Sequence, residues 1–179
     1  QAALTLNTTG SNNTAVGSAA LDANTTGSHN TALGKDALTQ NSTGSHNHGY
    51  GVSALKTNTT GVRNIAIGYD ALGANTTAND NIAIGHEALK SNTTGTRNVA
   101  VGKGALDANT TASSNTAVGD NALGVNTGSD NTAIGRSALS DNTSGTRNVA
   151  VGALCLDANT TGSDNTAIGD NALGACTTG

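Results

Sequence analysis

Three histidines near the amino-terminal end have the spacing that a metal site would need. His29 and His46 are one repeat period apart, and His48 lies two residues beyond His46. Neighbouring coils of a β-structure lie roughly 4.8 Å apart, so the three imidazoles could converge on Zn²⁺ or Ni²⁺. The sequence offers no clear partners to orient the rings, so we expect neither a metal nor another cofactor and keep this trio as an alternative.

Hydroxyl side chains form a second pattern that could bind a surface. Segments of the type Thr-Gly-Ser/Thr recur at a fixed phase and would place two hydroxyls on one side of each coil. Flat Thr arrays of this kind resemble the faces of ice-binding proteins, although Val62 and Asn79 interrupt the array and a polar or charged residue follows in most coils. Solvation of a turn explains the hydroxyls equally well. The candidate binding residues are Thr26, Ser28, Thr43, Ser45, Thr60, Thr94, Thr96, Ser144, Thr146, Thr161 and Ser163.

No group of residues with the makeup of a catalytic site recurs along the chain. Neither a Ser/His/Asp set nor a carboxylate pair repeats, and a thin solenoid has little room for a cleft. The two cysteines, Cys155 and Cys176, occupy different positions of the repeat, so we expect two separate thiols. We therefore expect that the protein is not an enzyme.

The elements that would position these residues follow from a repeat of about 17 residues, N-[TIV]-A-[VIL]-G-x-x-A-L-x-x-N-T-T-G-[ST]-x. Short periods are typical of β-helices and β-rolls, in which each repeat is one coil. We predict one all-β domain over residues 1–179, a β-solenoid of about ten coils, without recognisable caps and with a partial coil at 1–12. Because the chain starts at Gln1 and stops within a repeat, we expect a processed chain or a fibre segment. The coils begin near residues 13, 30, 47, 64, 81, 98, 115, 131, 148 and 165.

Equivalent positions of successive repeats form columns along the solenoid. The column that begins at Gly17 contains only Gly, which predicts a corner with positive φ or a close backbone approach. Asn-Thr-Thr-Gly forms a second, more tolerant corner, since Asn126-Thr127-Gly128 lacks one Thr. Its Asn column predicts a hydrogen-bonded ladder. The same Asn residues form glycosylation sequons, which leaves a glycosylated matrix repeat as an alternative.

The Ala-Leu pair and the strand segment define the predicted interior. The Leu of the pair, such as Leu89, never varies, so it is expected in the core. In the strand, alternate residues face opposite sides, and we place the small Ala column inside and the Val/Ile column outside as an apolar association stripe. The opposite phase, with Val and Ile inside a self-sufficient monomer, stays open. The predicted oligomer face contains Ile65, Ile67, Ile82, Ile84, Val99 and Val101.

Segments such as Asn64–Gly68 and Asn98–Gly102, each followed by x-x-A-L, carry a family resemblance. They resemble the head repeats of YadA-type trimeric autotransporter adhesins and repeat regions of phage-type tail fibres. The resemblance implies a left-handed β-roll, association into trimers and binding of matrix or host surface molecules. This repeat is longer than those of the adhesin heads, and no neck, stalk or anchor follows, so a fibre segment is the safer expectation.

Composition excludes several partners. The net charge is −4 and the charged fraction is 11%, without a basic run, so nucleic acid is not expected to bind. No apolar run is long enough for insertion into a membrane. We expect an extracellular or cell-surface adhesive fibre module that self-associates into a trimer or filament and binds host or matrix molecules. The alternative is an ice-binding (antifreeze) protein.

Overall fold

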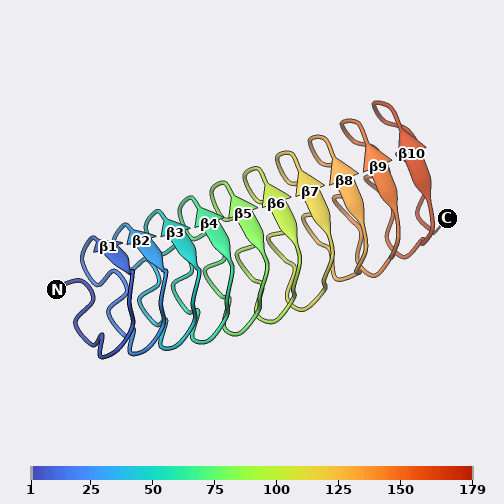
Figure 1. The fold of residues 1–179 in the computed structure, drawn as a ribbon. Coiled ribbons are helices and arrows are strands. Elements are labelled where there is room, and N and C mark those ends of the chain that lie inside the picture. Colours follow the sequence, from blue (N-terminus) through green and yellow to red (C-terminus); the bar gives the residue numbers. More distant parts are fainter. Residues whose placement is uncertain (1, 179) are drawn as a thin grey trace.

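The computed structural model describes residues 2–178 and confirms the all-β solenoid. Ten short strands lie side by side in one parallel sheet, and their order in the sheet is their order in the chain (Figure 1). The described residues contain no helix that could cross a membrane. The strands are β1 (Thr14–Val16), β2 (Thr31–Leu33), β3 (His48–Tyr50), β4 (Ile65–Ile67), β5 (Ile82–Ile84), β6 (Val99–Val101), β7 (Thr116–Val118), β8 (Thr132–Ile134), β9 (Val149–Val151) and β10 (Thr166–Ile168).

Each coil stacks on the next in the register of the sequence repeat. Ala66 of β4 pairs with Ala83 of β5, and the same offset continues along the sheet. Only three residues of each coil form a strand, but backbone hydrogen bonds between coils continue outside the strands, as from Leu89 N–H to the Ala105 carbonyl at 2.9 Å. Stacking of equivalent residues is therefore the rule around most of the coil.

The interior consists of the Leu column, two Ala columns and two Asn columns. Leu89, Ala88 and the strand residue Ala83 have no exposed surface, and the same holds in nearly all coils. The Ala column of the strands therefore faces inward, as predicted, and the strands' Val and Ile residues lie outside. The core contains side chains no larger than Leu, so each coil depends on its neighbours to exclude water.

The turns require unusual backbone conformations in every coil. Gly85 has φ +137°, a region open only to glycine, and a Cβ there would lie 2.4 Å from the Gly102 carbonyl oxygen. This confirms the predicted corner. Leu89 has φ 53° and Glu87 has φ 58°, both in the left-handed region although neither is glycine. That conformation costs free energy for a residue with a Cβ, and the stacking of the buried Leu column offsets the cost.

The predicted Asn ladder forms at the Asn-Thr-Thr-Gly corner. In a typical rung, Asn58 Nδ2 donates to Asn41 Oδ1 at 2.7 Å and to the Gly61 carbonyl at 3.1 Å. The Asn side chains from Asn24 to Asn159 have no exposed surface. A glycan on these buried side chains is therefore incompatible with the folded chain.

The Asn that opens each repeat makes a different set of bonds. Asn64 Oδ1 accepts the backbone N–H of Asn81 at 3.1 Å, and Asn64 Nδ2 donates to the Ala78 carbonyl at 2.8 Å. One amide thus joins two coils and also binds the next turn of the Asn-Thr-Thr-Gly type along the chain. Both Asn columns supply hydrogen bonds that the backbone of a three-residue strand cannot make alone.

The short repeat breaks both Asn columns at one place. Within the described chain, Asn109 Oδ1 and Asn115 Nδ2 have no hydrogen-bond partner, whereas their equivalents in the preceding coils do. Asn126 instead donates to the Gly128 carbonyl at 2.6 Å. Because one Thr is missing, the Asn126 amide binds a carbonyl two residues ahead, where the other coils bind one three residues ahead. The amides of Asn109 and Asn115 lose their hydrogen-bond partners. The Asn-Thr-Thr-Gly turn therefore accepts the deletion, as predicted, but two buried amide groups lose their hydrogen bonds.

Candidate functional site

The three histidines do not converge. His29 and His46 stack with ring centroids 4.8 Å apart and an interplanar angle of 3°. His48 lies on β3, and its Nδ1 has no hydrogen-bond partner in the described structure. Among residues 2–178, no group of three His, Cys, Asp or Glu side chains is arranged to hold a metal ion. The rings of His29 and His46 therefore form a stack on the surface.

The Thr-Gly-Ser/Thr segments point two side chains outward on either side of an inward-facing residue, as predicted. Thr94 is exposed, Gly95 is buried, and Thr96 is partly exposed. The backbone N–H of Thr96 donates to the Ser113 hydroxyl at 3.0 Å, and the same bond joins Ser28 to Ser45. The second hydroxyl column thus binds the backbone of the preceding coil. We call the two outward columns the turn hydroxyl face.

Of the other reactive groups, Cys155 is buried, Cys176 is partly exposed and Lys90 is ion-paired. Cys155 and Cys176 are free thiols, and burial raises the pKa of Cys155, which disfavours the thiolate. An open hollow of about 400 Å³ lies where Gly73 has no side chain between Lys56 and Lys90. Lys90 Nζ there is bound to Glu87 at 2.7 Å and lies 3.7 Å from Asp70. The hollow therefore does not present Lys90 as a free amine.

The outward residues of β1 to β10 form one continuous surface, which we call the strand face, and its third-position column is apolar throughout. Its third-position column is the more exposed, with Val16 55%, Ile67 40% and Ile168 73% exposed. The first-position column, such as Ile82, is partly exposed and mixes Thr and His with Ile and Val. All six residues of the predicted oligomer face lie here: Ile65, Ile67, Ile82, Ile84, Val99 and Val101.

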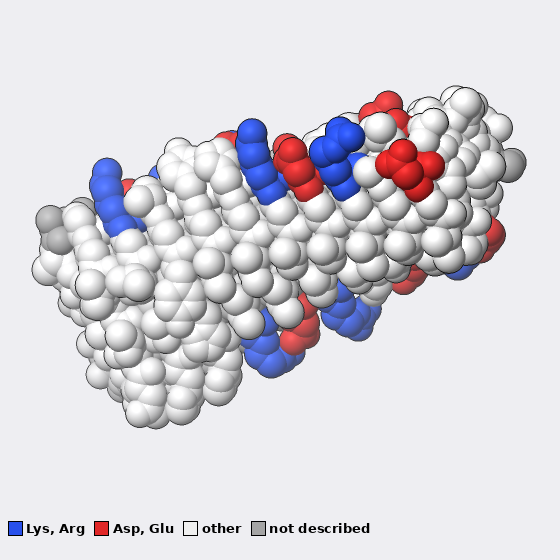
Figure 2. Space-filling model, turned by 90° about the horizontal axis from the view of Figure 1, so that it is seen from above, with Lys and Arg blue, Asp and Glu red and all other residues white. Residues whose placement is uncertain are grey.

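Charged side chains border the strand face along both edges. The charged residues two positions before each strand and two positions after it are exposed, and on the pre-strand side a buried or half-buried Asn separates them from the strand. Figure 2 shows the result, a broad band without Lys, Arg, Asp or Glu between two rows of charges. The pre-strand row contains Arg63, Asp80, Arg97, Ser114, Asp130, Arg147 and Asp164. The post-strand row contains Lys35, Lys103, Asp120, Arg136 and Asp170.

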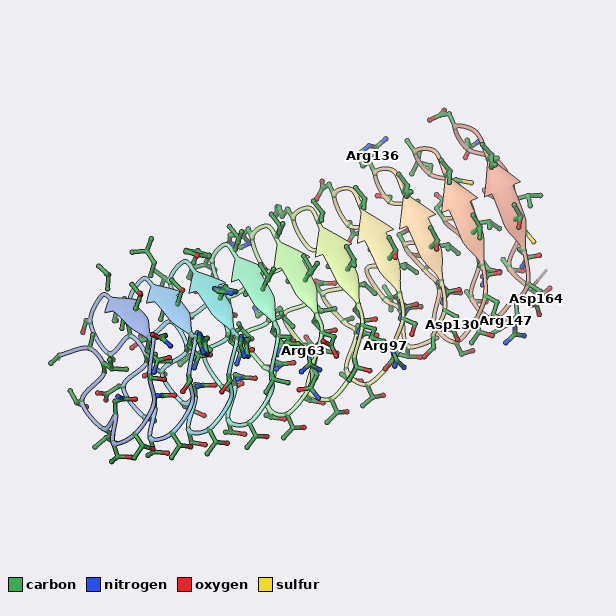
Figure 3. All side chains as sticks on the ribbon, viewed as in Figure 1. Arg63, Arg97, Asp130, Arg136, Arg147 and Asp164 are labelled. Carbon is green, nitrogen blue, oxygen red and sulfur yellow. The ribbon has the colours of Figure 1, made fainter. Side chains whose placement is uncertain are left out.

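Two bidentate ion pairs join successive coils within the pre-strand row (Figure 3). Arg63 binds Asp80 through Nε at 2.6 Å and Nη2 at 3.0 Å, and Arg147 binds Asp164 at 2.6 and 2.8 Å. The hydrogen bonds from Arg63 lower the pKa of Asp80, and those from Arg147 lower the pKa of Asp164. Both pairs are largely exposed, so they orient side chains more than they stabilise the fold.

Ion pairing within the pre-strand row was not predicted from the sequence, where these residues were considered only as an obstacle to ice binding. Opposite charges one period apart, as at Arg63 and Asp80, were the signal that could have found it. The strand face, by contrast, was expected from its alternation. Its combination of an apolar centre and a charged border is typical of protein interfaces.

Comparisons with protein-family models, with curated proteins and with solved structures give no match to this chain.

Proposed function

We propose that this chain is an extracellular structural and adhesive fibre module that self-associates through its strand face. The observation that carries the proposal is the third-position column of the strand face, which is apolar in all ten strands. Ten strands spaced about 4.8 Å apart make the face about 43 Å long, and two side-chain columns make it about 10 Å wide. A surface on the order of 400 Å² lies within the range of the largest apolar patches that monomers expose, and such patches are often functional.

The rest of the module suits a structural role. Its described side chains are held by repeated contacts between coils, and they gather no nucleophile beside a base. The resemblance of its strand segments to adhesin heads and tail-fibre repeats supports the same assignment. Binding of host or matrix molecules would then use the surfaces left free by association, among them the turn hydroxyl face.

The oligomeric state at micromolar concentration tests the proposal. Sedimentation velocity of the wild-type chain should show a dimer, trimer or filament, and Ile84→Lys should reduce it to a monomer with unchanged circular dichroism. Lys90→Glu, a charge reversal outside the strand face, is the control and should leave the assembly intact. A wild-type chain that stays monomeric at high micromolar concentration would contradict self-association.

Ice binding is the second candidate, favoured by one observation. The outer Thr column is exposed and uninterrupted over six successive coils, at Thr26, Thr43, Thr60, Thr77, Thr94 and Thr111. Two features weigh against it, since the second hydroxyl column is occupied with backbone hydrogen bonds and the pre-strand row lies beside it. Tightly hydrated charges disrupt an ordered water lattice.

Thermal hysteresis separates the two candidates. If ice binding is correct, the wild-type chain shows hysteresis or shapes ice crystals, and Thr94→Tyr abolishes the effect without lowering stability. We expect no effect on ice growth from the wild-type chain, in which case the Thr columns serve the turns.

A further inference from the structure

The charges of the pre-strand row are arranged antisymmetrically. From β4 to β10 the row reads Arg63, Asp80, Arg97, Ser114, Asp130, Arg147, Asp164. Counted outward from Ser114, each cation on one side has an anion at the same distance on the other. Backbone bonds keep the row continuous through the short repeat, with Ser114 N–H bound to the Thr96 carbonyl at 2.9 Å and Asp130 N–H to the Ser113 carbonyl at 3.1 Å.

We propose that two copies of this chain pair antiparallel along the pre-strand row and the adjoining strand face, with a two-fold axis beside Ser114. This inference rests on the proposed self-association and specifies its geometry. The axis brings coil β4 of one copy opposite β10 of the other, and β7 opposite itself. Arg63 then faces Asp164 of the second copy, Asp80 faces Arg147, and Arg97 faces Asp130.

The residues left unpaired in the single chain support this arrangement. Arg97 and Asp130 form no ion pair within 4.0 Å among the described residues, since their neighbours of opposite charge, Asp80 and Arg147, bind Arg63 and Asp164. The two-fold axis pairs Arg97 with Asp130, twice per dimer. The apolar columns match as well, because Ile84 meets Val151 and Val101 meets Ile134 of the second copy. Burial of the strand face supplies the free energy, and the charges select orientation and register.

Parallel arrangements in register are less favourable. If two copies lay parallel with the pre-strand rows in contact, all six charges would face like charges. If the pre-strand row met the post-strand row in register, Arg97 would face Lys103 and Asp164 would face Asp170, and only Asp130 would face an opposite charge, Arg136. Like charges placed opposite one another are destabilising. The antiparallel axis would also place Lys103 opposite Arg136 and Asp120 opposite its own copy, so the contact must be centred on the pre-strand row, with the post-strand rows held apart.

Disulfide trapping tests the orientation. Cys155→Ala and Cys176→Asn restore the residues typical of their columns and remove the native thiols. In that background, Ser114→Cys should yield a covalent dimer under mild oxidation, because a residue on the axis meets its own copy within disulfide reach. His46→Cys is the matched control, with nearly the same φ (60° against 61°) in the same turn position, and should not cross-link because β3 lies outside the overlap.

Charge exchange tests the pairing independently. Arg97→Asp should weaken association about tenfold, and adding Asp130→Arg should restore it to within about threefold of the wild type. Equal cross-linking at residues 46 and 114 would overturn the inference in favour of a parallel assembly. An assembly that neither cysteine traps would overturn it while leaving self-association intact. A background protein that is monomeric, like the wild type, would overturn both.

Discussion

The interior and the strand face of this solenoid follow opposite rules. Inside, the columns that contain Leu89, Ala88 and Asn92 admit almost no variation, and their members have no exposed surface. On the strand face, one column changes from Thr to His, Ile and Val along the sheet, and its neighbour from Val to Leu, Tyr and Ile. An interior side chain packs against copies of itself above and below, so any change affects three coils. A strand-face side chain meets solvent or a partner, and many residues suit that position.

The largest expected effect is a loss of interior packing. Leu89→Ala should lower the free energy of unfolding by about 2–5 kcal/mol, because it removes a fully buried side chain from a stack that cannot close the gap. Lys90→Ala, at the adjacent partly exposed position, should change it by less than about 0.5 kcal/mol. Urea denaturation measures both values. Comparable losses at the two residues would refute the assignment of the Leu column to the core.

The Asn ladder should be the next most sensitive part of the interior. Asn92→Ala removes the donor to Asn75 Oδ1 and to the Gly95 carbonyl, and the acceptor of Asn109 Nδ2. Buried polar groups left without partners should lower the free energy of unfolding by about 1–3 kcal/mol. Thr94→Ala, two residues away on the surface, is the control and should be near neutral. A neutral Asn92→Ala would show that the ladder adds nothing to stability.

Repair of the short repeat should stabilise the chain. An additional Thr inserted between Thr127 and Gly128 restores the 17-residue spacing, and with it partners for Asn109 Oδ1 and Asn115 Nδ2. We expect a gain of about 1–2 kcal/mol in the free energy of unfolding. The same insertion before Gly27, in an intact repeat, should destabilise the chain. If both insertions destabilise to the same extent, the short turn is a well-adapted variant and no defect.

The exposed ion pairs should have the smallest effect. Because hydrogen bonds from arginine lower the pKa of Asp80 and Asp164, their stabilisation is present above the ordinary aspartate pKa of 3.8 and disappears as the pH falls through the lowered value. The melting temperature of the wild-type chain should therefore fall slightly more between pH 5 and pH 2 than that of the Asp80→Asn/Asp164→Asn variant. An equal fall in melting temperature for the two proteins would show that these ion pairs do not contribute to stability.

The interior was far easier to predict than the surface. A column that contains only Gly or only Leu reports a constraint shared by all coils, so the corner at Gly85 and the core at Leu89 followed from the repeat. The left-handed conformation of Leu89 did not, because tertiary stacking imposes it against local preference. The separate hydrogen-bond roles of the two Asn columns also depend on which turn each amide reaches across the coil, which spacing alone does not specify.

The candidate surfaces were predicted only in part. Alternation placed Ile67 and Ile84 outside, and the structure confirms that position. The histidines His29, His46 and His48 are not arranged to hold a metal ion, and His29 and His46 stack ring on ring. The bidentate geometry of Arg63 with Asp80 depends on rotamers and was beyond a reading of residue types.

The melting temperature as a function of protein concentration tests the central claim most directly, that the strand face is an association surface outside a self-sufficient core. For the wild-type chain it should rise with concentration, because association stabilises the folded state by mass action. For Ile84→Lys it should be independent of concentration and equal to the wild-type value at high dilution. A wild-type melting temperature that does not change with concentration, or an Ile84→Lys chain that melts far lower at every dilution, would contradict the account.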